Sequence, residues 1–576
     1  MKNYNAEYER WLNSPSLNEA ERTELLSIAD NEDLKELRFS SPMSFGTAGL
    51  RSDMYMGIGC MNRFTVAWTT RGIASLIKSL GREADGVVIA YDSRNNSELF
   101  ARVSASVLAG AGIKVYIFDS LRPTPELSFA VRELSCAAGI NITASHNPKE
   151  YNGYKAYWED GAQISPEQAK IVSAERELFD VLDLSGLSDY SEAVKAGLIV
   201  ELSGEFDEKY INAVLKTSIY DSVIADVADE LRVVYTPLHG AGYKLVPEVF
   251  KRRGLKHLYT VAEQMVPNGD FPTVKKPNPE YADVFSLGID IANEVGSDLV
   301  IATDPDSDRV GVMARNKDGA FVTVSGNQMG ALLLDYSIKA HKASGGLPEG
   351  AYCVKSLVST DMADKIARSN GVVMHDVLTG FKFIGEVIKN YEAKGKTDGF
   401  LLGFEESYGY LLGTYARDKD AVEGAMIILE MTAYYKKLGM TLIDALDALY
   451  ECYGYYKERT VDIYMEGLDG IERRKRVMSA LREKIPSDFG GYRVKSYADY
   501  SVGIVTDTES AEKTGTGQPL SDVLYYTLIN DDKIIVRPSG TEPKIKIYIL
   551  AHGENPAELD RKIEIYETVT KRIGEV

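Results

Sequence analysis

The stretch SDLVIATDPDSDR, residues 297–309, joins an apolar run to a cluster of acidic side chains. The run DLVIA predicts a buried strand, and a loop that follows such a strand lies at the functional edge of an α/β sheet. Asp304, Asp306 and Asp308 are spaced by two, which predicts three carboxylates on one side of an extended chain. Because like charges repel, an oxygen-liganded cation such as Mg²⁺, rather than Zn²⁺, is the expected partner.

Two other metal-dependent motifs contain acidic loops of this kind. An EF-hand needs glycine at its sixth position and glutamate at its twelfth, but Arg309 and Arg315 stand there, so that motif is excluded. A phosphatase that uses the first aspartate of Asp-x-Asp as its nucleophile stays open on spacing alone. A solvated acidic turn is the simplest structural interpretation.

The same plan occurs three times along the chain. Each copy is a buried strand with a small polar loop, followed by a second buried strand that ends in a chemically rich loop. The pairs lie at residues 85–94 and 137–148, 231–242 and 297–309, and 351–362 and 398–410. This plan predicts three related α/β units with mixed sheets, whose loops would meet around a central cleft.

The two ends of the chain differ from these units in texture. Residues up to about 38 are charged and amphipathic and predict helix, with Trp11, Leu12, Leu25 and Leu26 as apolar points. From about residue 456 the pattern changes, and KIIVRPSGTEPKIKIYIL, residues 533–550, predicts two strands around a turn. We expect a smaller α+β domain there.

Ser145 lies in the stretch GINITASHNPKEYNGYKAY, residues 139–157. A short strand ends before it, and Pro148 disfavours helical geometry at Asn147, so the serine sits on a loop. The Gly-x-Ser-x-Gly elbow of hydrolases is absent. His146 is a poor base for Ser145 if the chain is extended, because adjacent side chains then point apart. Taken alone, the segment is typical of a plain turn.

Composition limits the classes of function. The chain has 576 residues and a net charge of −20, which argues against a general nucleic-acid binder. We find no membrane-spanning apolar run and no signal peptide, and the four cysteines are far apart in sequence. These features predict a cytoplasmic protein with no membrane partner and with reduced, buried cysteines.

Four further loops offer polar groups. GTAGLR, residues 46–51, is a glycine loop with an arginine, and RPSGTEP, residues 537–543, combines a guanidinium, hydroxyls and backbone N–H groups suited to a phosphate. GFEESYGY, residues 403–410, could bind sugar hydroxyls, and LTGFKF, residues 378–383, places a lysine after a glycine turn. The segment KGKTDG, residues 394–399, resembles the end of a phosphate-binding P-loop, but Asn390 stands where that motif requires its first glycine.

Taken together and in this order, the loops GTAGLR, TASHNP, DPDSDR, GFEESYG and RPSGTEP resemble those of the α-D-phosphohexomutases. The resemblance covers nearly the whole chain, and its length and sugar loop are most similar to phosphoglucomutases of the longer cytosolic type. It implies four domains, the last one mobile and phosphate-binding. The expected boundaries are 1–205, 206–322, 323–455 and 456–576.

The resemblance also implies roles for particular residues. Ser145 would carry the transferable phosphate and would ligate Mg²⁺ together with Asp304, Asp306 and Asp308. Catalytic roles are implied for Lys155 as general acid/base and for Arg51 and Arg309 at the phosphate, and His146 is kept as a candidate catalytic residue. The substrate-binding set would comprise Glu405 and Ser407 for sugar hydroxyls, and Thr379, Gly380, Lys382, Arg537, Ser539, Gly540 and Thr541 for the non-reacting phosphate.

The implied reaction interconverts glucose 1-phosphate and glucose 6-phosphate through glucose 1,6-bisphosphate, which also serves as activator. Tyr408 and Gly409 follow Ser407, with no histidine, whereas mutases that act on mannose and glucose often have Gly-His there, so this departure argues against mannose. Some relatives with similar loops prefer pentose 1-phosphates, so phosphopentomutase is the main alternative activity, and phosphomannomutase is kept as another. Two hypotheses from other functional classes are a magnesium-dependent sugar phosphatase and a non-catalytic sugar-phosphate sensor. The expected partners are small sugar phosphates, and no oligomeric partner is predicted.

Overall fold

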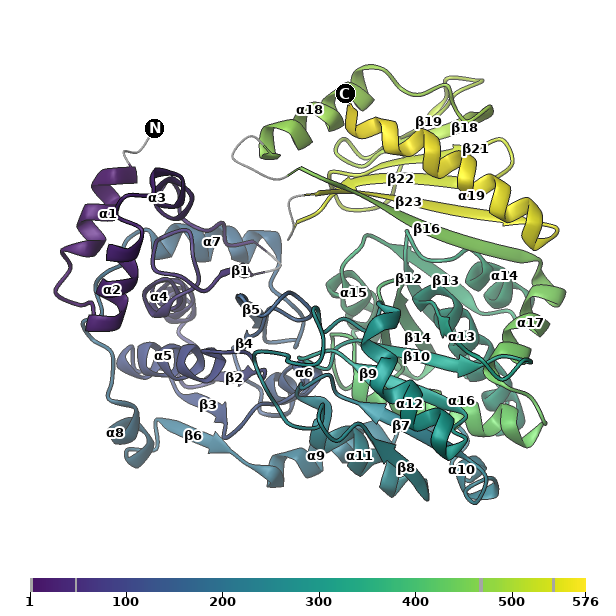
Figure 1. Cartoon of the computed structure of the whole chain (residues 1–576), viewed down its shortest axis with the longest axis horizontal. Coiled ribbons are helices and arrows are strands. Elements are labelled where there is room, and N and C mark those ends of the chain that lie inside the picture. The colour runs from purple at the N-terminus through teal and green to yellow at the C-terminus, as the bar shows by residue number, and fades with distance from the viewer. Residues whose placement is uncertain (1–3, 47–48, 466–469, 541–543, 576) are drawn as a thin grey trace. The chain divides into compact units, whose positions relative to one another are not determined.

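The computed structural model describes residues 4–46, 49–465, 470–540 and 544–575. The chain forms two compact units, coloured along the sequence in Figure 1. The N-terminal unit comprises residues 1–324, 388–394 and 409–439, and the C-terminal unit comprises residues 325–387, 395–408 and 440–576. Each unit is described by itself.

The N-terminal unit begins with three short helices, not with one amphipathic helix. These are α1 (Tyr4–Leu12), α2 (Glu19–Ser27) and α3 (Glu32–Phe39). The side chains of Asn18 and Asn31 accept backbone N–H groups at the starts of α2 and α3, so each asparagine begins a new helix. The helices share an apolar cluster, which includes Trp11 and Phe39, with the next long helix, α4 (Arg63–Ser79).

The first sheet is mixed and has the strand order β1-β5-β4-β2-β3-β6. Its central strands pair in parallel, while β5 pairs antiparallel with both β4 and β1. The strands are β1 (Leu50–Asp53), β2 (Val87–Tyr91), β3 (Val115–Phe118), β4 (Ala138–Ile142), β5 (Tyr151–Trp158) and β6 (Ile199–Leu202). The other helices of this region are α5 (Ser97–Gly110), α6 (Thr124–Glu133), α7 (Pro166–Arg176) and α8 (Tyr190–Lys195).

The second sheet has the order β11-β10-β9-β7-β8 and is also mixed. Its strands are β7 (Arg232–Thr236), β8 (His257–Thr260), β9 (Leu299–Thr303), β10 (Val310–Arg315) and β11 (Phe321–Val324). The helices are α9 (Gly204–Leu215), α10 (Val223–Asp226), α11 (Gly242–Arg252) and α12 (Ser286–Val295), and α16 (Ala421–Lys437) packs against α10 and α11.

The C-terminal unit contains the third α/β layer. Strand β12 (Tyr352–Ser356) pairs in parallel with β13 (Val373–Val377) and with β14 (Phe400–Glu405). The helices are α13 (Gly326–Ala343), α14 (Met362–Ser369), α15 (Phe381–Glu392) and α17 (Leu442–Tyr453). A capping box between Ser325 and Gln328 begins α13, where the Ser–x–x–Gln pattern requires it.

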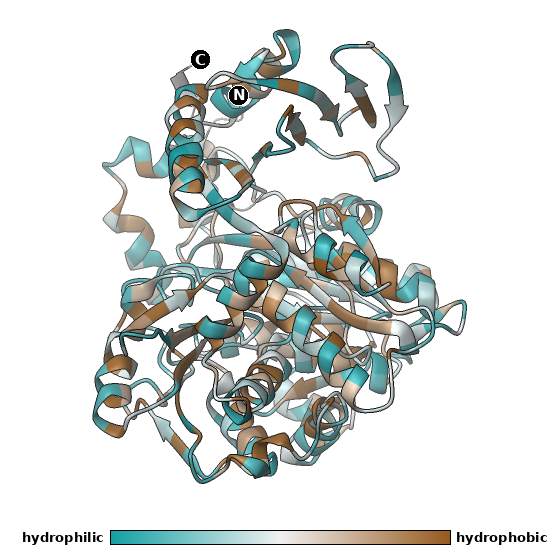
Figure 2. Cartoon of the chain, turned by 90° about the vertical axis from the view of Figure 1, so that its right-hand side faces the viewer, coloured by the Kyte–Doolittle hydropathy of each residue, from teal (hydrophilic) through white to brown (hydrophobic). Residues whose placement is uncertain are grey.

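The chain ends in an antiparallel sheet with α19 (Pro556–Lys571) packed on it and α18 (Gly470–Glu483) beside it (Figure 1). The strand order is β16-β23-β22-β21-β18-β19-β20. The strands are β16 (Tyr455–Tyr464), β17 (Asp488–Phe489), β18 (Tyr492–Asp499), β19 (Ile504–Asp507), β20 (Lys513–Gly515), β21 (Leu524–Leu528), β22 (Lys533–Pro538) and β23 (Lys544–Gly553). Apolar and polar positions alternate around α19 in Figure 2, as expected for a helix that covers a sheet.

The predicted fold class is therefore confirmed: three mixed or parallel α/β layers precede a smaller α+β domain. The four domain boundaries and the central cleft stay predictions. Three of the four cysteines are buried as expected, but Cys452 is exposed, and none of the four is in a disulfide. In the part of the chain that the structure describes, no helix combines the length and apolar character needed to cross a bilayer.

Candidate functional site

The acidic loop between β9 and β10 curls instead of running extended. Ser307 has a left-handed backbone (φ 54°), and one carboxylate oxygen of Asp304 accepts the backbone N–H groups of Asp308 (3.1 Å) and Arg309 (3.0 Å). The expectation of an extended chain is therefore wrong in geometry. The curl still brings the three carboxylates together, because it wraps residues 305–309 around the first aspartate.

These three carboxylates form a buried group that fits a hard cation. One oxygen from each of Asp304, Asp306 and Asp308 lies within 4.8 Å of the others, and all three side chains are at most 1% exposed. Oδ1 of Asp306 and Oδ1 of Asp308 are buried without a hydrogen-bond partner. Burial, followed by the charges of Asp306 and Asp308, raises the pKa of Asp304 well above its ordinary value. A divalent ion would satisfy the orphaned oxygens and relieve the repulsion.

The structure places Ser145 beside this group. Ser145 lies on the loop between β4 and β5, is 3% exposed, and donates a hydrogen bond from Oγ to Oδ2 of Asp304 at 2.8 Å. Its own N–H donates to Oγ1 of Thr143 at 2.8 Å. A serine 159 positions away in sequence thus reaches the acidic loop.

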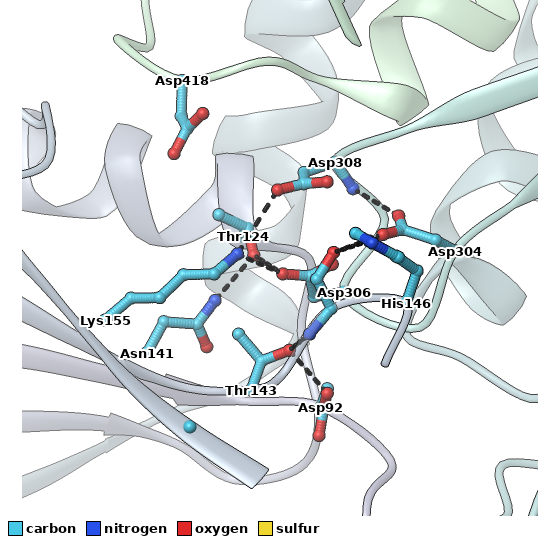
Figure 3. Close-up of polar contacts among 12 residues, drawn as sticks. Asp92, Thr124, Asn141, Thr143, His146, Lys155, Asp304, Asp306, Asp308 and Asp418 are labelled. Carbon is cyan, nitrogen blue, oxygen red and sulfur yellow. Dashed lines mark hydrogen bonds and ion pairs between the residues drawn. The ribbon is translucent and has the colours of Figure 1, made fainter. Parts of the chain in front are cut away.

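His146 turns toward Ser145 rather than away from it. Nδ1 of the imidazole lies 3.2 Å from Oγ of Ser145, and Figure 3 shows the ring beside the acidic loop. The expectation that adjacent side chains point apart assumed an extended chain. Ser145 instead has φ 52°, in the left-handed region, which brings the two side chains to the same side.

Lys155 reaches the acidic group from β5, as the register of the first sheet requires. Asn141 on β4 faces Lys155 on β5, and Nζ of Lys155 lies 2.7 Å from Oδ2 of Asp306 and 3.4 Å from Oδ2 of Asp308 (Figure 3). Burial alone would lower the pKa of Lys155, but these two carboxylates outweigh it and raise the pKa. The ammonium is therefore charged at neutral pH.

Sequence reasoning missed a second lysine, Lys419. Its Nζ lies 2.8 Å from Oδ2 of Asp308 and 3.2 Å from Oδ1 of Asp418. Asp418 in turn accepts from the hydroxyl of Tyr157 at 2.8 Å. A Cβ added at Gly409 would lie 2.4 Å from Cδ of Lys419, so a larger residue there would force the lysine stem to move. The signal was the run RDKD, residues 417–420, a charged run that resembles a solvated loop but is buried.

Thr124 is a second residue that the sequence did not single out. It begins α6, donates from Oγ1 to Oδ2 of Asp306 at 2.9 Å, and its N–H donates to the Asp306 carbonyl at 2.8 Å. Asn141 donates to the same threonine hydroxyl at 2.6 Å. The positive end of the α6 dipole therefore faces the acidic loop.

Two predicted arginines lie nearby with other partners. Nη1 of Arg51 donates to Oδ1 of Asn147 at 3.1 Å, which ties the glycine loop to the serine loop. Nη1 of Arg309 donates to Oε1 of Glu280 at 2.5 Å. Thr47 and Ala48 of the GTAGLR motif lie outside the described residues.

The predicted sugar loop joins the predicted lysine loop in the C-terminal unit. Glu405 is 5% exposed and accepts the N–H of Gly380 at 2.7 Å, next to Thr379. Glu406 accepts from Oγ of Ser356 at 3.0 Å. The loops that follow β12, β13 and β14 therefore meet at one edge of their sheet, with Ser407 on the third of them.

Lys382 and the C-terminal loop complete the predicted phosphate-binding set. Burial lowers the pKa of Lys382. Arg537 is the last residue but one of β22, and Ser539 follows the strand, with its N–H donating to the Lys544 carbonyl at 2.9 Å. Gly540 is exposed, and Thr541 lies outside the described residues.

Three family models match the chain in sequence. They are described as phosphoglucomutase/phosphomannomutase alpha/beta/alpha domains I, II and III, and they match residues 42–178, 208–319 and 325–453. A phosphoglucomutase of Staphylococcus saprophyticus is 36% identical over 533 residues, which is 92% of this chain and 95% of the relative. A phosphoglucomutase of Staphylococcus epidermidis is 37% identical over 88% of this chain and 91% of its own length.

Solved structures share the fold at lower identity. A putative phosphomannomutase from Thermus thermophilus has a TM-score of 0.67 at 21% identity, with 93% of this chain and 100% of that chain covered. The open form of parafusin, a phosphoglucomutase from Paramecium, has a TM-score of 0.64 at 16% identity, with 92% and 95% covered. The family models and the curated relatives together establish that this chain belongs to the phosphoglucomutase/phosphomannomutase family, the α-D-phosphohexomutases.

Proposed function

We propose that this protein is a phosphoglucomutase, an enzyme that interconverts glucose 1-phosphate and glucose 6-phosphate through glucose 1,6-bisphosphate. The observation that carries the proposal is the position of Ser145, whose Oγ lies 2.8 Å from Asp304 within a buried carboxylate group. The curated relatives named phosphoglucomutase cover nearly the whole chain at 36–37% identity, which supports the same assignment.

Asp304, Asp306 and Asp308 would hold Mg²⁺, with the phosphorylated Ser145 as a further ligand. Their buried, partly unsatisfied oxygens suit a hard cation. When bound, the ion would withdraw charge from the phosphoryl oxygens. The protein's own part is to keep four acidic or phosphorylated groups close together and to balance them with Lys155 and Lys419.

The proton chemistry follows from two contacts. His146 Nδ1 lies 3.2 Å from Oγ of Ser145 and is suited to exchange the proton of that hydroxyl. Lys155 is assigned as the general acid/base, and its buried ammonium, 2.7 Å from Asp306, supplies positive charge near a leaving oxygen. In the first step a sugar hydroxyl attacks the phosphorus on Ser145, the bond from phosphorus to Oγ breaks, and the bisphosphate forms. After reorientation, Oγ attacks the phosphorus of the other phosphate, the bond from that phosphorus to the sugar oxygen breaks, phosphoserine is regenerated and glucose 6-phosphate leaves with the proton returned to its oxygen.

The remaining assignments concern substrate recognition. We assign Arg51 and Arg309 to the transferring phosphate. Glu405 and Ser407 are assigned to sugar hydroxyls. The non-reacting phosphate is assigned to Thr379, Gly380, Lys382, Arg537, Ser539, Gly540 and Thr541. The partners are small sugar phosphates, and we place the enzyme in the cytoplasm, in line with its four cysteines outside any disulfide.

The test compares Ser145→Ala with Ser337→Ala in a coupled assay for glucose 6-phosphate, with Mg²⁺ and trace bisphosphate present. We expect Ser145→Ala to lose activity by at least ~10³-fold, because the covalent route is removed. Ser337 is a buried helical serine without a hydrogen-bond partner for Oγ, so its alanine variant should keep full activity. Full activity in Ser145→Ala would reject the proposal.

The same enzyme should be assayed with mannose, glucosamine, ribose and deoxyribose 1-phosphates. A higher kcat/KM for a pentose or for mannose would reassign the substrate without changing the serine mechanism. Steady release of inorganic phosphate that is indifferent to Ser145→Ala would instead favour a phosphatase that uses Asp304 or Asp306. Ligand binding without turnover and without phosphoserine would indicate a sensor.

A further inference from the structure

The guanidinium of Arg94 hydrogen-bonds to the backbone of the serine loop, the segment between β4 and β5 that carries Ser145. Arg94 follows β2 and is 3% exposed. Its Nη2 donates to the carbonyls of Ser145 (2.5 Å) and Asn147, and its Nη1 donates to those of Pro148 (2.8 Å) and Tyr151 (3.0 Å). One guanidinium therefore satisfies four carbonyls of a single seven-residue segment.

Only arginine can make this set of contacts. Its planar fork offers five N–H donors in fixed directions, whereas lysine presents one ammonium with three donors on a flexible stem. Each buried carbonyl left without a donor would cost roughly 1–3 kcal/mol. A lysine or glutamine at position 94 would therefore leave part of the loop backbone unsatisfied.

Asp92 holds the other side of the arginine and the start of the same loop. Its Oδ2 lies 3.3 Å from Nε of Arg94 and accepts from Oγ1 of Thr143 at 2.6 Å, as Figure 3 shows for the threonine. The same Thr143 hydroxyl accepts the N–H of Ser145. Oγ of Ser97 also donates to Oδ1 of Asp92, at 2.8 Å. Both sides of the Ser145 peptide are thus tied to one buried ion pair.

A loop of the second sheet packs over the Arg94 guanidinium. The ring of Phe271, on the loop that follows β8, lies over the Arg94 guanidinium with its centroid 5.1 Å away. A Cβ added at Gly269 would lie 2.4 Å from the backbone nitrogen of Asn95, so this loop touches the Arg94 segment directly. Arg94 therefore contacts both the serine loop of the first sheet and the loop that follows β8 in the second sheet.

The hydrogen bonds from Arg94 explain why Ser145 keeps an unfavourable backbone conformation. Ser145 has φ 52°, and a non-glycine residue in the left-handed region costs roughly 1–2 kcal/mol. Such strain persists where the surroundings hold the residue in place. The strained conformation is what directs Oγ toward Asp304 and the imidazole of His146.

We propose that Arg94 is a positioning residue that, with Asp92, holds Ser145 in the left-handed conformation used for phosphoryl transfer. The expected effect on kcat rests on the proposed function, but the effect of Arg94 on the order of the loop can be tested without any substrate. A misplacement of the reacting atom by about 1 Å can cost on the order of 10²-fold in rate.

The experiment compares Arg94→Lys and Arg94→Gln with Arg253→Lys. Arg253 is also a buried arginine (9% exposed), and its ion-pair partners, Glu430 and Asp221, lie outside the serine loop. We expect both Arg94 variants to lose kcat on the order of 10²-fold with KM changed by less than about twofold. Amide hydrogen exchange, measured without substrate, should rise in a peptide spanning residues 143–152.

Arg253→Lys should lower thermal stability while leaving kcat per folded molecule and exchange in the 143–152 peptide unchanged. Thr143→Val is a milder second variant, which removes the acceptor of the Ser145 N–H and should cost about tenfold in kcat. Unchanged exchange in this peptide, or unchanged kcat in the folded Arg94 and Thr143 variants, would overturn the proposal. A wild type without mutase activity would refute the proposed function, while the exchange measurement would still decide the role of Arg94 in the loop.

Discussion

Magnesium should stabilise the N-terminal unit through Asp304, Asp306 and Asp308. Their convergent oxygens lie within 4.8 Å and are buried, so in the metal-free protein their repulsion opposes folding. The perturbation is the addition of Mg²⁺ to protein treated with a chelator, in the wild type and in Asp308→Asn. Asp308 is the most informative of the three, because both lysines of the site contact it.

The size of the effect follows from linkage. A ligand that binds only the folded state at 100 times its Kd stabilises by about 2.7 kcal/mol. For a unit of this size, that corresponds to a rise in Tm of roughly 4 °C. Asp308→Asn removes one ligand charge, and we expect it to lose most of the rise, since two carboxylates with two neighbouring ammonium groups attract a cation weakly.

The assay is calorimetry or a thermal-shift titration with Mg²⁺ at constant ionic strength. Asp335→Asn serves as the matched control, because Asp335 is a buried aspartate of α13 that lies outside the carboxylate group. The control should keep the full wild-type response. An equal rise in Tm for the wild type and for Asp308→Asn would refute the metal assignment of the acidic loop.

The remaining predictions concern the lysine that the sequence did not reveal and a buried acid. Lys419→Met should lower kcat by ~10²-fold or more in the coupled assay, and Gly409→Ala should lower it by about tenfold, because a Cβ 2.4 Å from the lysine stem displaces the ammonium. Normal kcat in both would remove Lys419 from the mechanism. Burial, with the charge of Asp420, raises the pKa of Glu423 from 4.5 to about 8, so the folded protein holds a proton that the unfolded chain releases. Stability should therefore fall between pH 4.5 and 8, by up to about 1.4 kcal/mol per pH unit, and Glu423→Gln should flatten this part of the urea-unfolding profile against pH; an unchanged slope would contradict the assignment.

The sequence by itself determined the strands, the loops and the chemical content of those loops. An apolar run followed by small and polar residues encodes a strand end locally, so Ser145, the three aspartates and the Glu405 loop could be located without coordinates. The order of the loops was enough to indicate the family.

Only the tertiary structure decided how those groups meet. Ser145 and Asp304 are 159 positions apart, and the left-handed turns at Ser145 and Ser307 depend on contacts that come from other strands. Lys419 stands in a run of charges that would be solvated in most proteins, and here it is buried and paired with Asp308 and Asp418. The physical reason is that hydrophobic periodicity and secondary-structure propensity act over a few residues. Whether a charged side chain is buried depends instead on which distant partners the topology brings to the same sheet edge.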